Sequence, residues 1–114
     1  MKYRGSCHCG KVRFEFEGEI GTVVSCNCSI CSRRGSLLHF TSRDAMSVTG
    51  EEELATYTFN KHVIKHRFCK TCGILPYGEG VDPKGNRTAA VNVRCLEDFD
   101  LAALKIHHYD GKNA

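Results

Sequence analysis

The sequence predicts a small, mostly β domain of antiparallel sheets with little helix. Apolar residues alternate with polar ones at a period of two along much of the chain, which is typical of half-buried strands. Residues 82–85 read Asp-Pro-Lys-Gly, a turn in which proline presets φ and glycine accepts a positive φ. Only one short segment has a helical pattern.

The elements follow from this alternation in chain order. The clearest strand is at residues 11–17, where Val12, Phe14 and Phe16 alternate with charged residues. Residues 20–25 are β-branched and residues 37–41 form another short apolar run. Residues 46–48 and 54–59 have the same character and flank a turn at Gly50. We expect a strand at each of these segments.

The second half of the chain continues the pattern. Residues 62–68 place His66 and Phe68 on one face, and residues 88–95 place Ala89, Val91, Val93 and Cys95 on one face. Between residues 98 and 104 we expect a short helix capped by Asp98 or Asp100. Residues 106–109 are expected to return as an edge strand.

Length and charge limit the classes of function. A chain of 114 residues suits one domain, which we expect to span residues 1–114. The net charge of +3 falls well short of the dense basic surface of a nucleic-acid-binding protein, so no nucleic acid partner is expected. The chain shows neither a secretory signal nor a membrane span, which predicts a cytoplasmic protein without a membrane partner.

The eight cysteines are the unusual feature of the composition. In a reducing compartment thiols stay free, so dense cysteine there indicates metal binding or catalysis rather than disulfides. The spacing agrees, because Cys7 and Cys9, like Cys26 and Cys28, are separated by one residue, an awkward geometry for a disulfide. The sequence therefore predicts a metalloprotein.

Seven cysteines form three clusters of two, three and two: Cys7 and Cys9; Cys26, Cys28 and Cys31; Cys69 and Cys72. A structural zinc takes four ligands, so joining the two pairs makes a closed site and leaves the triple as an open one. Three protein ligands with a vacant fourth position are typical of a catalytic zinc. The alternatives are a second structural site completed by Cys95, a histidine or an aspartate, and an iron–sulfur cluster.

Other polar residues have simpler interpretations. Cys95 is expected to be a buried thiol, and His39 and His66 are expected to be core or half-exposed histidines. Arg33 and Arg34 follow the triple directly. An arginine there suits the carboxylate of a small anionic thiol, but a solvated charged turn is the simpler interpretation.

These clusters carry a resemblance to a known family. Residues 5–14 (Gly-Ser-Cys-His-Cys-Gly-Lys-Val-Arg-Phe), 26–31 (Cys-Asn-Cys-Ser-Ile-Cys) and 68–73 (Phe-Cys-Lys-Thr-Cys-Gly) resemble the glutathione-dependent formaldehyde-activating enzyme family, which includes the centromere protein V relatives. Residues 91–96 and 108–111 look like the same family. The resemblance covers nearly the whole chain.

The resemblance implies a β-tent fold with two zinc ions. Carried over by position, the structural zinc falls to Cys7, Cys9, Cys69 and Cys72, and the catalytic zinc to Cys26, Cys28 and Cys31. The implied activity is a carbon–sulfur lyase reaction that condenses formaldehyde with glutathione to S-hydroxymethylglutathione. The partners expected are therefore a small-molecule thiol and an aldehyde. The alternative is a zinc-stapled protein-interaction module without chemistry, which a basic tail would favour and this chain lacks.

Overall fold

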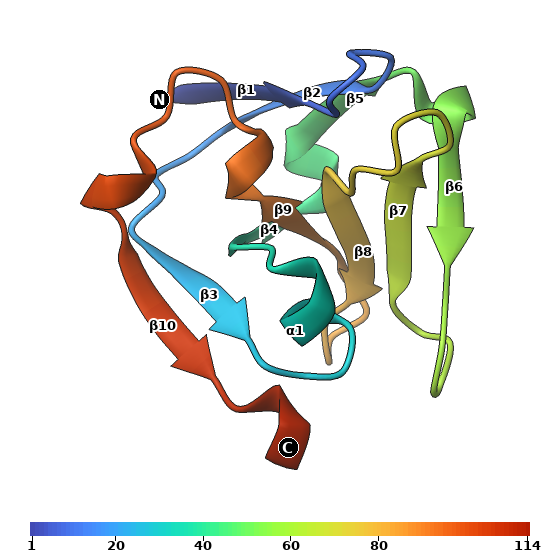
Figure 1. Ribbon diagram of the computed structural model, residues 1–114, viewed down its shortest axis with the longest axis vertical. Coiled ribbons are helices and arrows are strands. Elements are labelled where there is room, and N and C mark those ends of the chain that lie inside the picture. The colour runs from blue at the N-terminus through green and yellow to red at the C-terminus, as the bar shows by residue number, and fades with distance from the viewer.

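A computed structural model describes residues 1–114 and shows ten strands in two sheets (Figure 1). The smaller sheet has the order β1-β2-β5 and the larger one β10-β3-β4-β9-β8-β7-β6. The strands are β1 (Lys2–Ser6), β2 (Arg13–Glu17), β3 (Thr22–Cys26), β4 (Leu38–Ser42), β5 (Met46–Thr49), β6 (Leu54–Tyr57), β7 (Lys65–Cys69), β8 (Tyr77–Val81), β9 (Arg87–Asn92) and β10 (Lys105–Tyr109).

Helix is limited to short pieces. They are α1 (Cys31–Arg34) and the 3-10 turns η1 (Arg43–Ala45), η2 (Glu51–Glu53), η3 (Val93–Cys95), η4 (Leu101–Ala103) and η5 (Gly111–Asn113). None of these helices is long and apolar enough to cross a membrane. The expectation of a mostly β chain with little helix is confirmed.

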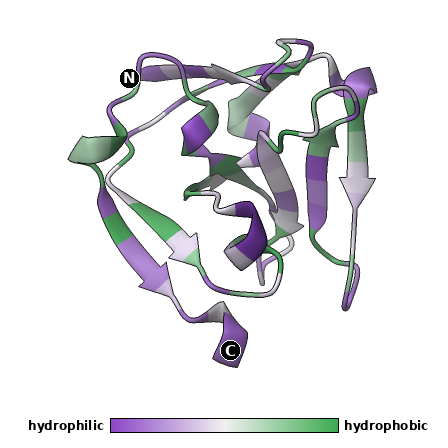
Figure 2. Cartoon of the chain, in the orientation of Figure 1, coloured by the Kyte–Doolittle hydropathy of each residue, from purple (hydrophilic) through white to green (hydrophobic).

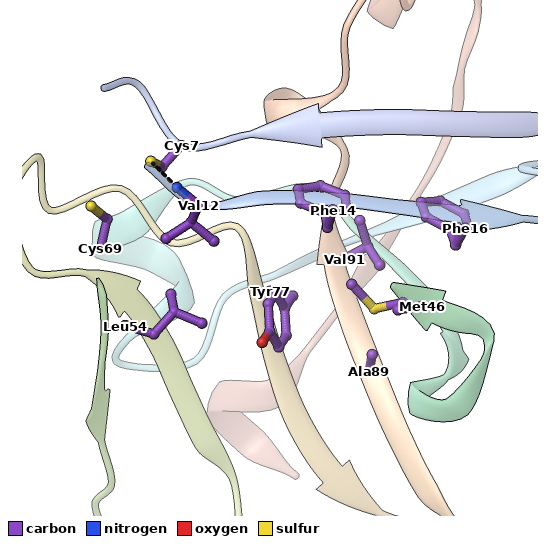
Figure 3. Packing of buried hydrophobic residues seen from close by; sticks show 10 residues of the cluster. All are labelled: Cys7, Val12, Phe14, Phe16, Met46, Leu54, Cys69, Tyr77, Ala89 and Val91. Carbon is purple, nitrogen blue, oxygen red and sulfur yellow. Dashed lines mark hydrogen bonds between the residues drawn. The ribbon is translucent and has the colours of Figure 1, made fainter. Parts of the chain in front are cut away.

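The core lies where the two sheets face each other (Figure 3). Phe14 and Phe16 of β2, and Val12 just before that strand, are almost fully buried, as their alternation predicts. Tyr77 and Val91 meet them from β8 and β9 of the larger sheet. Coloured by hydropathy, α1 and much of β7 are hydrophilic, whereas β3 and β9 carry hydrophobic residues (Figure 2).

All but one of the strand pairs are antiparallel. The exception is β10, which runs parallel to β3 at the edge of the larger sheet, so the edge strand expected at residues 106–109 is confirmed. The turn expected at residues 82–85 joins β8 to β9, and the Asp82 carboxylate accepts hydrogen bonds from the backbone N–H of Lys84 and of Asn86. That side chain holds the turn closed.

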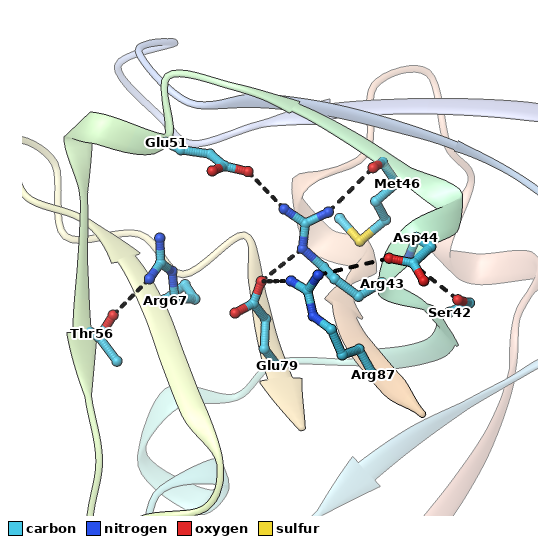
Figure 4. A network of polar contacts seen from close by, with 9 residues as sticks. All are labelled: Ser42, Arg43, Asp44, Met46, Glu51, Thr56, Arg67, Glu79 and Arg87. Carbon is cyan, nitrogen blue, oxygen red and sulfur yellow. Dashed lines mark hydrogen bonds and ion pairs between the residues drawn. The ribbon is translucent and has the colours of Figure 1, made fainter. Parts of the chain in front are cut away.

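Arg43 of η1 forms polar contacts with residues of both sheets (Figure 4). Its guanidinium donates to Glu79 of β8 at 2.7 Å, to Glu51 of η2 at 2.7 Å and to the Met46 carbonyl at 3.2 Å. Arg87 of β9 lies 3.9 Å from the same Glu79 carboxylate. This network ties β8 to the segment between β4 and β6.

Three expectations need correction. The strand expected at residues 88–95 ends at Asn92, whose side chain accepts from the backbone N–H of Arg94 and caps η3, so Cys95 leaves the strand face. The strand expected at residues 62–68 begins at Lys65, because His62 has a positive φ. The expected short helix is the 3-10 turn η4, which Asp100 caps and Asp98 does not.

Two strands were not expected from the sequence. β8 contains Gly78 and Gly80, and glycine is depleted in strands, so its pattern is weak. β1 contains little apolar side chain beyond Tyr3. Both strands are stabilised by neighbours on the sheet rather than by local propensity.

Candidate metal centres

Four cysteines from the two sheets meet at one end of the core. Cys7 and Cys9 lie in the turn between β1 and β2, and Cys69 and Cys72 lie at the end of β7 and in the turn after it. Their four Sγ atoms all lie within 4.8 Å of one another. The structure therefore brings together the two pairs that the sequence analysis joined.

The spacing of these sulfurs fits a tetrahedral ion. Cys7 Sγ and Cys9 Sγ are 3.6 Å apart, as are Cys9 Sγ and Cys69 Sγ. Four sulfurs around zinc at roughly 2.3 Å would be separated by roughly 3.8 Å. The donor set and its spacing thus suit a closed zinc site.

Backbone N–H groups support the thiolate form of these cysteines. The N–H of Val12 donates to Cys7 Sγ at 3.4 Å. Burial raises the pKa of Cys72, but hydrogen bonds from the backbone N–H of Cys9 and of Ile74 outweigh it and lower that pKa to about 6. Metal binding requires deprotonated cysteine, so these contacts favour it.

The second cluster lies around the junction of β3 and α1. Cys26 ends β3, Cys28 lies in the turn, and Cys31 begins α1. Their Sγ atoms also lie within 4.8 Å of one another, and neither a fourth cysteine nor a histidine or acidic residue joins them. Cys95 packs against the main core instead, so it does not supply the fourth ligand that the alternative of a second structural site required.

The thiols of this cluster shift one another's pKa values. Burial raises the pKa of Cys31, and the neighbouring Cys28 raises it further, to about 12. The pKa of Cys28 is lowered, because hydrogen bonds to its sulfur, led by the backbone N–H of Cys31, outweigh the effect of burial. Three adjacent thiolates need a compensating cation, and Arg34 Nη2, which donates to Cys31 Sγ at 3.6 Å, supplies one positive charge. A divalent ion would supply the rest, so the residues present fit zinc here too.

The C-terminal segment forms one wall of this cluster. β10 pairs with β3 so that Tyr109 lies opposite Cys26, and the backbone N–H of Asn27 donates to the Tyr109 carbonyl. The Asn27 side chain donates to Asp110 at 2.9 Å and accepts from the backbone N–H of Lys112 at 2.9 Å. These bonds hold the turn η5 against the cysteines.

A cavity of about 360 Å³ opens beside this second cluster. Cys26, Cys28 and Cys31 line it, whereas the four-cysteine cluster does not. Its other lining residues are Val24, Ile30, Arg34, Leu38, Phe40, Phe59, Ile64, His66, Leu75, Gly78, Glu79, Gly80, Thr88, Ala90, Tyr109, Gly111 and Ala114. The two clusters therefore differ in their access to a small molecule.

Arg34 and His66 form a pair at the wall of this cavity. Arg34 donates to His66 Nδ1 at 3.3 Å and to Ser36 Oγ at 3.0 Å. Because Nδ1 accepts, the neutral imidazole carries its proton on Nε2. The pKa of His66 is lowered, first by burial and then by the charge of Arg34. His66 also stacks on Phe59, with ring centroids 5.4 Å apart.

The remaining candidates lie away from the cavity. Arg33 donates to the Ser29 carbonyl at 2.6 Å. Of the two arginines that follow the three-cysteine cluster, only Arg34 therefore lines the cavity. His39 stacks on Phe16, and burial lowers its pKa. Cys95 packs against the main core, and its thiol donates to the Leu75 carbonyl at 3.8 Å. Burial raises the pKa of Cys95 to about 11, but the residue is only partly buried, so the buried thiol expected from the sequence is confirmed only in part.

Comparison with known proteins identifies this arrangement. Residues 2–111 match the family described as glutathione-dependent formaldehyde-activating enzyme. The chain belongs to that family. The match spans both cysteine clusters, so the resemblance found in the sequence is confirmed. Membership in the family supports an enzyme that acts on a small thiol and an aldehyde.

A solved structure supports the fold. A crystal structure of a Rhodobacter sphaeroides protein is 31% identical in sequence and superimposes with a TM-score of 0.78. The similarity covers 91% of this chain and 99% of that one. The likeness thus extends over nearly the whole of both chains.

Sequence reasoning missed the wall of the second cluster. Gly111 was noted only as part of a family-like tail, and nothing indicated that it lies against Cys26. The small residues Gly78, Gly80 and Ala90, which line the cavity, also escaped notice. No local pattern marks such residues, because their importance comes from what lies opposite them.

Proposed function

We propose that this protein is a zinc-dependent carbon–sulfur lyase that condenses a small thiol, glutathione or a similar one, with formaldehyde or another small aldehyde, or catalyses the reverse cleavage. The observation that carries this proposal is the cavity beside Cys26, Cys28 and Cys31. In the condensation the thiol sulfur bonds to the carbonyl carbon, the C=O π bond breaks, and the thiol proton ends on the oxygen of the hydroxymethyl product.

The proposal gives the two clusters different roles. Cys7, Cys9, Cys69 and Cys72 would hold a structural zinc that joins the sheets, and Cys26, Cys28 and Cys31 a catalytic one. A zinc ion in the second cluster would supply a Lewis acid that lowers the pKa of a thiol at its fourth position. Two sheets closed by four cysteines also support the β-tent description.

The chain's own residues support the reaction in three ways. Arg34 places a positive charge beside Cys31 and so offsets the charge of the thiolates. Asn27 and Asp110 hold the C-terminal wall in place. The apolar walls of the cavity lower the polarity around the reacting sulfur, which strengthens each electrostatic contact there.

We further propose that residues 1–114 act as one domain with two zinc ions. The core shared by the two sheets supports a single unit, because β2 packs against both β8 and β9. Cysteines gathered in two metal-ligand groups are typical of a reducing compartment, and a cytoplasmic location is therefore part of the proposal.

A non-catalytic interaction module is the second candidate. The observation that favours it is a set of exposed apolar side chains near the cavity, including Val63, Ile64 and Val81, each more than half exposed. Such residues are typical of a docking surface. This candidate predicts no thiol-dependent conversion of formaldehyde.

Three preparations separate the two candidates: wild type, Cys28→Ser and Cys72→Ser. We expect two zinc ions per chain in wild type and one in a folded Cys28→Ser protein that no longer accelerates the exchange between formaldehyde and its thiol adduct, followed by NMR. Cys72→Ser should unfold, because structural zinc contributes about 10 kcal/mol or more of folding energy. If Cys28→Ser unfolds as completely as Cys72→Ser, the catalytic assignment is wrong.

A further inference from the structure

Arg34 is a half-buried cation in the wall of the cavity beside the three-cysteine cluster. None of the ion pairs of the protein includes it, so no carboxylate of the chain pairs with its guanidinium. An arginine that is partly withdrawn from water normally pairs with an anion, because burying a charge without a partner is costly. The wall therefore presents a positive charge that a ligand can complement.

The guanidinium of Arg34 also keeps donors for a ligand. Of its five N–H groups, one on Nε donates to Ser36 Oγ, one on Nη1 to His66 Nδ1 and one on Nη2 to Cys31 Sγ. Each terminal nitrogen carries a second N–H group, and neither of these has an acceptor within the protein. Two such donors on a guanidinium that Ser36 and His66 hold in place suit the two oxygens of a carboxylate.

The other residues of the cavity leave this role to Arg34. It is the only lysine or arginine of the lining. Glu79, the acidic side chain of the lining, accepts from Arg43 at 2.7 Å and lies 3.9 Å from Arg87, so its charge is offset from the opposite side. Apolar wall residues such as Phe59 and Ile64 lower the local polarity and strengthen the attraction of an anion to Arg34.

Arg34 lies close enough to the cysteines for one small molecule to contact both. Its Nη2 is 3.6 Å from Cys31 Sγ, and the same cavity is lined by all three cysteines of the cluster. A thiol whose sulfur binds at the cluster therefore directs the rest of its chain past the guanidinium. Arg33 has no such place, because it is exposed, donates to the Ser29 carbonyl and does not line the cavity.

We propose that Arg34 recognises a carboxylate of the substrate thiol, so that the thiols accepted at the three-cysteine cluster are anionic ones. Glutathione, which carries two carboxylates, belongs to this class. The inference rests on the proposed thiol–aldehyde chemistry and names the residue that selects the thiol. Because it concerns a contact with the ligand, binding tests it independently of turnover.

The first test compares two thiols of nearly equal size by calorimetry on the zinc-loaded protein at neutral pH. They are 3-mercaptopropionate and 3-mercaptopropionamide, which differ in the charge of one end. A hydrogen-bonded contact between charged groups should make the wild-type protein bind the carboxylate about tenfold or more tightly than the amide. Equal affinities, or a preference for the amide, would overturn the inference without any variant.

Arg34→Gln assigns the preference to its residue. We expect this variant to bind the two thiols with similar affinity, whereas a merely structural role of Arg34 would weaken both by the same factor. Arg33→Gln is the matched control, since it removes the same charge from the neighbouring position outside the cavity, and it should keep the wild-type preference. A preference retained in Arg34→Gln would place the carboxylate on the metal ion instead, and one lost equally in Arg33→Gln would reduce it to overall charge. Either result contradicts the proposal.

Arg34→Lys covers the case in which the glutamine variant loses metal, because Arg34 also contacts Cys31. Lysine keeps the positive charge but lacks the planar set of donors, so its preference for the carboxylate should fall between those of wild type and Arg34→Gln. The zinc content of every variant is measured first. If Arg34→Gln does not hold a second zinc ion, a wild-type preference in Arg34→Lys refutes the contact.

Turnover distinguishes this inference from the function on which it rests. The exchange of formaldehyde with each thiol, and with glutathione, is followed by NMR on the same preparations. If the carboxylate preference depends on Arg34 and no thiol is turned over, the proposed reaction is wrong and the recognition by Arg34 stands. If thiols are turned over and Arg34→Gln leaves the ratio of kcat/KM for the carboxylate and the amide unchanged, the inference is wrong and the reaction stands.

Discussion

The backbone of Gly111 lies directly against the sulfur of Cys26. A Cβ added at Gly111 would stand 2.6 Å from Cys26 Sγ and 3.2 Å from Cys28 Cβ. Real Cβ atoms essentially never approach another heavy atom as closely as the first of these distances. The C-terminal turn therefore fits the three-cysteine cluster only with glycine at this position.

Gly111→Ala should weaken metal binding at the second cluster. The added methyl group would displace Cys26 Sγ, and moving a group that orients a ligand typically costs about tenfold to a hundredfold in affinity. Competition with a chelator measures the loss, and a zinc ion bound at the four-cysteine cluster should be unaffected. Gly21→Ala is the control, because a Cβ there meets nothing within 4 Å. Equal zinc affinities in the two variants would refute this role of Gly111.

Gly50→Ala should destabilise the fold strongly. Gly50 has a φ of +81°, and a Cβ there would overlap the carbonyl oxygen of Lys11 on the neighbouring turn. Gly85 has a similar φ of +87° but open space around it. We expect Gly85→Ala to cost about 1 kcal/mol through backbone strain alone, and Gly50→Ala about 3 kcal/mol or more. Urea unfolding of the zinc-loaded proteins measures both, and similar costs would show that the overlap is relieved easily.

Arg43→Met should cost far more stability than a comparable change on the surface. The side chains of Arg43 and Glu79 are only 11% and 17% exposed, so losing Arg43 leaves a largely buried carboxylate with only the more distant Arg87, at 3.9 Å, as its partner. Breaking such a pair costs about 3 kcal/mol or more, against about 1 kcal/mol or less for an exposed pair. Arg13→Met, which breaks the exposed pair with Glu97, is the control. The free energy of unfolding of each variant measures its loss of stability relative to wild type. Equal losses in the two variants would mean that the network of Figure 4 adds no more stability than an exposed pair.

His66 should make stability depend on pH. Its pKa lies below the ordinary 6.5 because of burial and then Arg34. As the pH falls through about 6.5, the unfolded chain gains a proton at His66 that the folded chain does not, so stability is lost. His66→Gln removes this contribution, and its free energy of unfolding should fall less than that of wild type between about pH 7 and about pH 5.5. Parallel pH profiles for the two proteins would contradict the assignment.

The strands with strong side-chain alternation were predictable from the sequence. Phe14 and Phe16 are buried on β2, as their period of two requires. β8 could not be predicted in this way, because Gly78 and Gly80 lack a strand pattern and the strand forms by pairing with β7 and β9. The alternation of apolar residues predicted that Cys95 lies on the strand, but the strand ends at Asn92, which caps a 3-10 turn that contains Cys95.

The sequence alone indicated the division of the seven clustered cysteines into four and three, because they occur in clusters of two, three and two and a closed zinc site takes four ligands. The tertiary structure decided what surrounds them. Strand order and register bring Gly111 against Cys26, place Ala90 opposite Gly78, and set Arg34 against His66. Alternation indicates which face of a strand is buried, but it does not encode which strand becomes its neighbour. The walls of the candidate site therefore depend on pairings between segments far apart in the chain.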